Sequence, residues 1–123
     1  MAKVAYYEIQ VDNFVRAQAF YGTIFDWKFS KMEAPFEYYM INSGPDDEKG
    51  IDGGMLQRQN SLTAGNGISA FVCTIYVTSI DETLEKVTQN GGSVAMPKTH
   101  LEGVGDFAYA VDTEGNTFGI WEK

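Results

Sequence analysis

The sequence contains few cysteine, histidine and basic residues, and each scarcity excludes a class of protein. Its one cysteine, Cys73, cannot form an internal disulfide, which is typical of proteins that work in a reducing compartment. Nine Lys and Arg residues against 17 Asp and Glu residues give a net charge of -8, which would repel both nucleic acid and anionic lipid. With a single histidine, any metal site would depend almost wholly on carboxylates, which suit harder ions such as Mg²⁺ or Ca²⁺.

Long apolar segments are absent as well. No run of residues approaches the length of a membrane-spanning helix, and Met1-Ala2-Lys3 leads directly into strand-like residues rather than into a signal peptide. We therefore expect a cytoplasmic protein with no membrane or nucleic-acid partner. The 123 residues, of which 44% are hydrophobic, suffice for a single domain over residues 1–123 and are too few for two ordinary domains.

The sequence does contain a repeated pattern. At one constant offset, Val11 aligns with Val77, and Gly53 aligns with Gly119. The helix-like residues 14–25 align with residues 80–91 at the same offset. Two copies of one supersecondary unit explain this agreement most simply, and chance similarity is the alternative.

Each copy predicts a β-α-β-β-β unit, and a polar linker over residues 59–67 joins them. In the first unit, over 4–58, we expect strands at 4–11, 27–32, 37–42 and 51–57 and a helix at 14–25. In the second unit, over 68–122, we expect strands at 68–77, 93–96, 107–111 and 117–121, with a helix that begins after Ser79. Ser79 and Glu82 have the spacing of a capping box, and Gly91 provides a left-handed stop.

Two residues of the second unit have expected positions that bear on chemistry. Cys73 falls on the helix-facing side of its strand, so we expect an inert core thiol. His100 falls in a loop over residues 98–105, outside the predicted strands, where a histidine is more often solvated than catalytic.

Strand periodicity divides each sheet into a face covered by the helix and an opposite face. If the two opposite faces curve toward each other, they enclose a cup, and a small-molecule site would lie there. The predicted lining of this cup comprises Tyr6, Glu8, Gln10, Gly53, Met55, Gln57, Val72, Thr74, Tyr76, Thr117, Gly119 and Trp121.

Several short segments stand out beside the two βαβββ patterns: Val11-Asp12 followed by Ala19-Phe20-Tyr21 and Phe25-Asp26-Trp27, then Gln89-Asn90-Gly91-Gly92 and Asp112-Thr113-Glu114-Gly115-Asn116. Together they resemble the vicinal oxygen chelate superfamily, which includes glyoxalase (lactoylglutathione lyase), bleomycin-resistance proteins and extradiol dioxygenases. Tyr7-Glu8-Ile9 and the segment from Gly115 to Trp121 look most like small glyoxalase-related proteins of undetermined activity. The resemblance implies an α+β fold of two paired βαβββ units whose curved sheets form a cup, and it implies a homodimer.

The same resemblance implies where a divalent metal would bind. Metal-dependent members use His, Gln or Glu at positions that correspond here to Tyr6, Gly53, Val72 and Gly119. Glycine and valine side chains have no donor atom, and a neutral tyrosine is a poor ligand. We therefore expect no cofactor and disfavour a metal, although Glu8 could still recruit a divalent ion weakly with water and substrate oxygens.

Glu8 is the main candidate for chemistry. A carboxylate in mid-strand that points into an apolar cup would be partly desolvated and suited to proton transfer, and a structural glutamate bonded to Gln10, Tyr6 or a partner subunit is an equal alternative. Tyr6 and Tyr76 could orient a ligand or could simply pack at a rim. The remaining candidates for ligand contact are Gln10, Met55, Gln57, Thr74 and Trp121.

These residues favour a metal-free cup that binds a small organic molecule, as a resistance or sequestration protein would. The alternative is a glyoxalase-related lyase or isomerase in which Glu8 is the general base and Tyr6 or Tyr76 polarises the substrate, with or without a divalent metal. A third alternative is an accessory subunit whose cup is collapsed.

Overall fold

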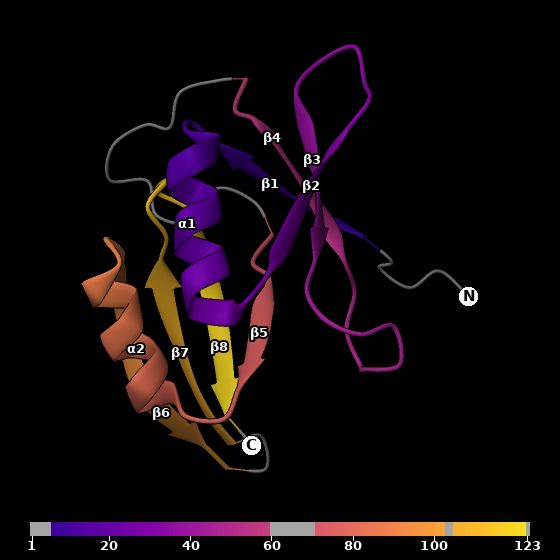
Figure 1. The fold of residues 1–123 in the computed structure, drawn as a ribbon. Coiled ribbons are helices and arrows are strands. Elements are labelled where there is room, and N and C mark those ends of the chain that lie inside the picture. Colours follow the sequence, from indigo (N-terminus) through magenta and orange to yellow (C-terminus); the bar gives the residue numbers. More distant parts are fainter. Residues whose placement is uncertain (1–5, 60–70, 103–104, 123) are drawn as a thin grey trace. The chain divides into compact units, whose positions relative to one another are not determined.

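The computed structural model describes residues 6–59, 71–102 and 105–122. The chain forms two compact units, Met1–Ser61 and Leu62–Lys123. Each unit has the predicted order of one strand, one helix and three further strands (Figure 1). The chain is therefore an α+β protein built from two similar modules, as the sequence predicts. None of the described helices is long and apolar enough to span a membrane.

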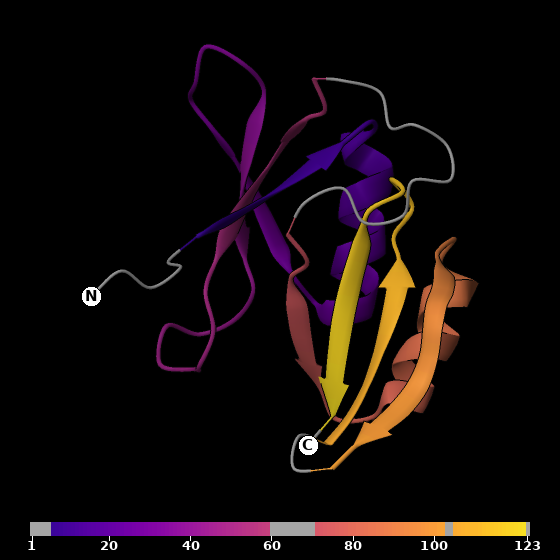
Figure 2. The ribbon, with the colours of Figure 1, turned by 180° about the vertical axis from the view of Figure 1, so that it is seen from behind.

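The first unit contains β1 (Tyr7–Val11), α1 (Phe14–Phe25), β2 (Lys28–Met32), β3 (Tyr38–Asn42) and β4 (Gly53–Gln57). The order in its sheet is β1-β4-β3-β2; β1 and β4 are parallel and the other pairs are antiparallel. The second unit contains β5 (Thr74–Val77), α2 (Ile80–Gln89), β6 (Ser93–Leu101), β7 (Gly105–Val111) and β8 (Thr117–Glu122). Its sheet has the equivalent order β5-β8-β7-β6, seen from behind in Figure 2.

The helix α1 begins and ends where its sequence predicts. The Asn13 side chain accepts a hydrogen bond of 2.9 Å from the backbone N–H of Arg16, which satisfies one of the free donors of the first turn. The helix ends at Asp26, which adopts a left-handed conformation with φ 60. The buried Tyr21 ring stacks on Trp27 at 4.9 Å, so the apolar stripe of α1 is anchored at its C-terminal end.

The helix α2 is also bounded as predicted. The Ser79 hydroxyl accepts a hydrogen bond from the N–H of Glu82 at 3.2 Å, and the N–H of Gly92 donates to the Val87 carbonyl at 2.9 Å. Gly91 has φ 92, a conformation in which a side chain would be strained. The helix covers a face of its sheet whose core residues are fully or almost fully buried, namely Ala108, Ala110, Phe118 and Ile120.

The register of β4 corrects one prediction. β1 pairs in parallel with β4, with Tyr7 opposite Gly53, Glu8 opposite Gly54 and Ile9 opposite Met55. Paired residues of neighbouring strands point to the same face, so Gly53, Met55 and Gln57 lie on the helix side and not beside Glu8. Met55 is accordingly 0% exposed. In the second unit Gly119 pairs with Thr74, and in the first unit Gly54 pairs with Glu8. Gly54 is therefore the equivalent of Gly119, whereas the sequence repeat aligned Gly53 with it.

The edge strand β6 corrects a second prediction. The expected strand over 93–96 continues to Leu101, through Pro97, with register irregularities between Val94 and Met96 and between Met96 and Thr99. An edge position tolerates Pro97 because its missing N–H would face away from the sheet. His100 therefore lies in a strand and not in a loop, and its Nδ1 is 2.7 Å from Asp106 Oδ1.

The prediction for Cys73 was also wrong. Cys73 is exposed and is not a core thiol. The physical reason is that β5 begins only at Thr74, so the alternation of buried and exposed side chains does not extend back to Cys73. Phe71 would lie on the same helix-facing side if the strand alternation extended to it, but it is 99% exposed.

Candidate functional site

The face of the first sheet opposite α1, called here the first open face, carries the candidate site. Strand pairing places Glu8 beside Gly54 and Met40, and Gln10 beside Leu56 and Tyr38. Tyr6, directly before β1, extends this face beyond Glu8. Tyr6 and Glu8 therefore share a face as the sequence predicts, together with Gln10, and Tyr38 is an addition that the sequence did not reveal.

A chain of hydrogen bonds links three side chains of the first open face. The Tyr38 hydroxyl donates to Glu8 Oε2 at 2.7 Å, and it lies 2.8 Å from the Tyr6 hydroxyl. Because the single proton of Tyr38 is directed to Glu8, its oxygen accepts from Tyr6. Tyr6 Oη also lies 3.6 Å from Met40 Sδ. We call Tyr6, Glu8 and Tyr38 the tyrosine–glutamate cluster.

The environment of Tyr38 keeps its hydroxyl protonated. Tyr38 is only 7% exposed. This burial is the largest cause, and the hydrogen bonds with Tyr6 and Glu8 are the next, of a pKa well above the ordinary tyrosine value. A neutral phenol is a hydrogen-bond donor, so Tyr38 fixes the orientation of the Glu8 carboxylate throughout the physiological pH range. Glu8 itself is exposed, and its carboxylate can meet a ligand.

Gly54 makes the position of Tyr38 possible. A Cβ atom built on Gly54 would overlap the Tyr38 hydroxyl and the neighbouring carbons of its ring. The absence of a side chain at this buried position therefore allows the Tyr38 ring to lie directly on the sheet and to reach Glu8 on the far strand.

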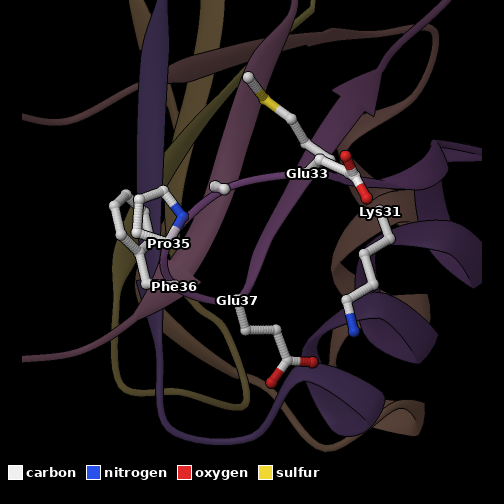
Figure 3. A pocket seen from close by; sticks show the side chains of 7 residues that line it. Lys31, Glu33, Pro35, Phe36 and Glu37 are labelled. Atoms are coloured by element: carbon white, nitrogen blue, oxygen red, sulfur yellow. The ribbon is translucent and has the colours of Figure 1, made fainter.

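The hairpin between β2 and β3 continues the first open face. Phe36 contacts Tyr38 edge to face, with ring centroids 6.1 Å apart and an interplanar angle of 72°. The hairpin also forms an open concavity of about 860 Å³, lined by Lys31, Met32, Glu33, Ala34, Pro35, Phe36 and Glu37. In Figure 3 the Pro35 and Phe36 rings lie together, apart from the Lys31 and Glu37 side chains.

The face of the second sheet opposite α2, the second open face, is aromatic. The rings of Tyr76 and Trp121 stack, with centroids 4.8 Å apart and an interplanar angle of 19°. Thr74 faces Gly119, where a Cβ atom would lie 2.6 Å from Thr74 Oγ1. Thr74, Tyr76 and Trp121 therefore occupy one face as predicted, and Tyr76 remains 52% exposed.

The residues at the positions implied for a metal do not suit one. Gly54, the position that the register makes equivalent to Gly119, has no donor atom, and neither does Gly119. The space that a side chain would need is occupied at both glycines, by Tyr38 at Gly54 and by Thr74 and Tyr109 at Gly119. No room is left there for a ligating side chain. Within the described ranges, no group of three or more His, Cys, Asp or Glu residues could hold a metal ion.

Comparisons with known proteins agree with the observed architecture. The model of the family described as "Glyoxalase/Bleomycin resistance protein/Dioxygenase superfamily" matches residues 3–120. No curated protein sequence matches the chain significantly.

Three solved structures that are 13–17% identical to this chain share its fold. A hypothetical protein from S. aureus is 16% identical, with a TM-score of 0.73 over 100% of this chain and 95% of that chain. A glyoxalase-related enzyme from Fulvimarina pelagi is 17% identical, with a TM-score of 0.71 over 100% of this chain and 89% of that chain. The fosfomycin resistance protein FosX from Listeria monocytogenes is 13% identical, with a TM-score of 0.72 over 100% of this chain and 94% of that chain.

Proposed function

The chain belongs to the glyoxalase/bleomycin resistance protein/dioxygenase superfamily, and from this premise we propose that it binds a small organic molecule without a metal ion. The tyrosine–glutamate cluster is the observation that carries the proposal. It places an oriented carboxylate on an exposed sheet face, where packing of the core does not require one. The second unit has an aromatic surface of its own, the stacked rings of Tyr76 and Trp121.

The proposal includes a homodimer in the cytoplasm that acts by sequestration, as a resistance protein does. The similarity of fold to a fosfomycin resistance protein supports a role in resistance without identifying the ligand, and sequestration is our own addition to it. The net charge of -8 supports the exclusion of nucleic acid as a partner.

Thermal-shift screening of the wild-type protein against a panel of small metabolites tests the proposal. A ligand that binds the folded state raises the midpoint of unfolding, by an amount that grows with the logarithm of its concentration relative to its dissociation constant. We expect Trp121→Ala to weaken binding of the ligands found and Glu8→Gln to change which ligands bind. Glu85→Gln is the matched control, because Glu85 is an exposed carboxylate on α2, outside the open faces, that also accepts a side-chain hydrogen bond, from Gln89 at 3.4 Å. Unchanged affinities in both Trp121→Ala and Glu8→Gln would refute the proposal.

A second candidate is a lyase or isomerase in which Glu8 is the general base. One observation favours it: Glu8 Oε2 is held by Tyr38, whereas Oε1 accepts no hydrogen bond from any described residue. A carboxylate held in this way could remove a proton from a bound substrate through Oε1.

Elemental analysis of the purified protein, combined with an assay for turnover of the ligands found, separates the two candidates. The binding proposal predicts no bound metal after gel filtration. Stoichiometric Ni, Zn, Mn or Fe, together with turnover that is lost in Glu8→Gln, would establish the enzyme instead.

A further inference from the structure

We propose that the ligand of the first open face is an organic cation, an amine or other protonated nitrogen base attached to an apolar or aromatic body. This inference rests on the proposed binding function and names the chemical class of its ligand. The argument has three parts, namely the charge of the face, the free oxygen of Glu8 and the exposed apolar groups around Tyr38.

The charge of the first open face is negative. Strand pairing places two charged side chains on it, Glu8 and Lys28. The Lys28 ammonium is neutralised by Asp26, whose Oδ1 lies 2.8 Å from Nζ. Arg58, just beyond the end of β4, has its Nε 3.3 Å from Asp12 Oδ1. In the described part of the chain, Glu8 forms no ion pair, so its charge is the one left for a ligand to neutralise.

The geometry of Glu8 requires a donor. Tyr38 occupies Oε2, and the other carboxylate oxygen accepts no hydrogen bond from a described residue. An ammonium group would supply both a donor and the opposite charge, so that donor and acceptor are both ionised. A neutral hydroxyl would supply the donor alone.

Exposed apolar groups around Tyr38, the hydrogen-bond partner of Glu8, fit the body of such a ligand. Tyr6, 41% exposed, is hydrogen-bonded to Tyr38; Met32, 47% exposed, pairs with it in the sheet; and the ring of Phe36, 58% exposed, contacts its ring. The electron-rich faces of Tyr6 and Phe36 also attract cations. An oriented carboxylate whose tyrosine partner is surrounded by exposed aromatic and methionine side chains is the pattern expected of a site for an organic cation.

An anionic ligand fits this face poorly. A phosphonate or carboxylate would approach Glu8 where the nearby cations, Lys28 and Arg58, are already paired. Lys31 does not compensate, because it pairs with Tyr39, whose ring contacts Phe14 of α1 on the opposite face of the sheet.

The test compares three probes that share a phenyl ring and differ in their end group: 2-phenylethylamine, 2-phenylethanol and phenylacetate. Binding to the wild-type protein is measured by NMR titration at neutral pH. We expect the amine to bind about tenfold or more tightly than the alcohol, and the acid to bind most weakly. Added salt should weaken the binding of the amine and leave the binding of the alcohol unchanged.

Two variants locate the preference. Glu8→Gln should make the amine and the alcohol bind equally, whereas Glu85→Gln, which removes an exposed carboxylate on α2, should bind all three probes as the wild type does. Equal or tighter binding of the acid or the alcohol to the wild type, failure of the amine to bind, or an unaltered preference in Glu8→Gln would overturn the inference. Binding of neutral or anionic ligands from the wider panel would then leave the proposed function standing, so the two failures are distinguishable.

Discussion

The Tyr38 hydroxyl donates a hydrogen bond of 2.7 Å to Glu8 Oε2, across the width of β4. β3 carries the donor and β1 carries the acceptor, and Gly54 of β4 lies between them. This bond connects two strands that do not pair with each other. It therefore serves both the stability of the first sheet and the orientation of the carboxylate that we assign to ligand binding.

We expect Tyr38→Phe to lower the free energy of unfolding by about 1.5 kcal/mol, because a buried hydrogen bond to a charged acceptor is lost while the ring remains. Urea denaturation followed by circular dichroism measures the change. The matched control is Tyr39→Phe, which removes the exposed bond to Glu37 and should cost less than half as much. Equal losses in the two variants would show that the Tyr38 bond has no special weight.

The raised pKa of Tyr38 predicts a pH dependence with a definite sign. In the unfolded chain Tyr38 loses its proton near the ordinary value of 10.0, while the folded protein retains it because burial and the bonds to Tyr6 and Glu8 favour the neutral form. The contribution of Tyr38 to stability is therefore complete below pH 10.0 and declines above it, by up to about 1.4 kcal/mol per pH unit. The stability difference between wild type and Tyr38→Phe should shrink above that pH, and a difference that grows there would contradict the assignment.

Gly54→Ala should displace Tyr38, because the new methyl group would occupy the space of its hydroxyl. We expect a loss of about 1–3 kcal/mol in the free energy of unfolding. In a Tyr38→Ala background the same substitution should cost much less, since the colliding ring is gone. A double-mutant cycle by urea denaturation measures this coupling, and additive losses would place the cause elsewhere.

Tyr76 and Trp121 should be coupled through their stacked rings. A double-mutant cycle with Tyr76→Ala and Trp121→Ala should give a coupling of about 0.5–1.5 kcal/mol in the free energy of unfolding. Tyr109→Ala paired with Tyr76→Ala is a suitable comparison, because no ring contact joins those two residues among the described aromatic pairs. A coupling near zero for Tyr76 and Trp121 would mean that the stack does not persist in solution.

The sequence predicted the elements of the fold better than their register. The bounds of the helix over residues 14–25, the cap at Ser79 and the strand alternation around Glu8 are local signals, and the structure confirms them. Which residues of β4 lie on the open face depends instead on the register in which β4 pairs with β1. A difference of one residue in that register places Met55 in the core and not in the predicted site.

Tyr38 was missed for the same reason. The sequence shows a strand over residues 37–42, but it does not show which of its faces meets Glu8, because that depends on pairing through β4. The glycine pair Gly53-Gly54 was the available signal, since a glycine inside a strand often marks a close approach of another group. In the second unit, the strand expected over residues 93–96 continues as β6 through Pro97 to Leu101, because an edge strand tolerates a proline.

The central claim is that a small organic molecule binds at the tyrosine–glutamate cluster of the first open face. NMR of protein with ¹³C-labelled tyrosine rings tests it directly, during titration with 2-phenylethylamine or with the tightest ligand from the thermal-shift panel. Our account predicts that the ring signals of Tyr6 and Tyr38 shift with a common affinity, and that Glu8→Gln weakens or abolishes these shifts. Ligand binding that leaves both ring signals unmoved would contradict it.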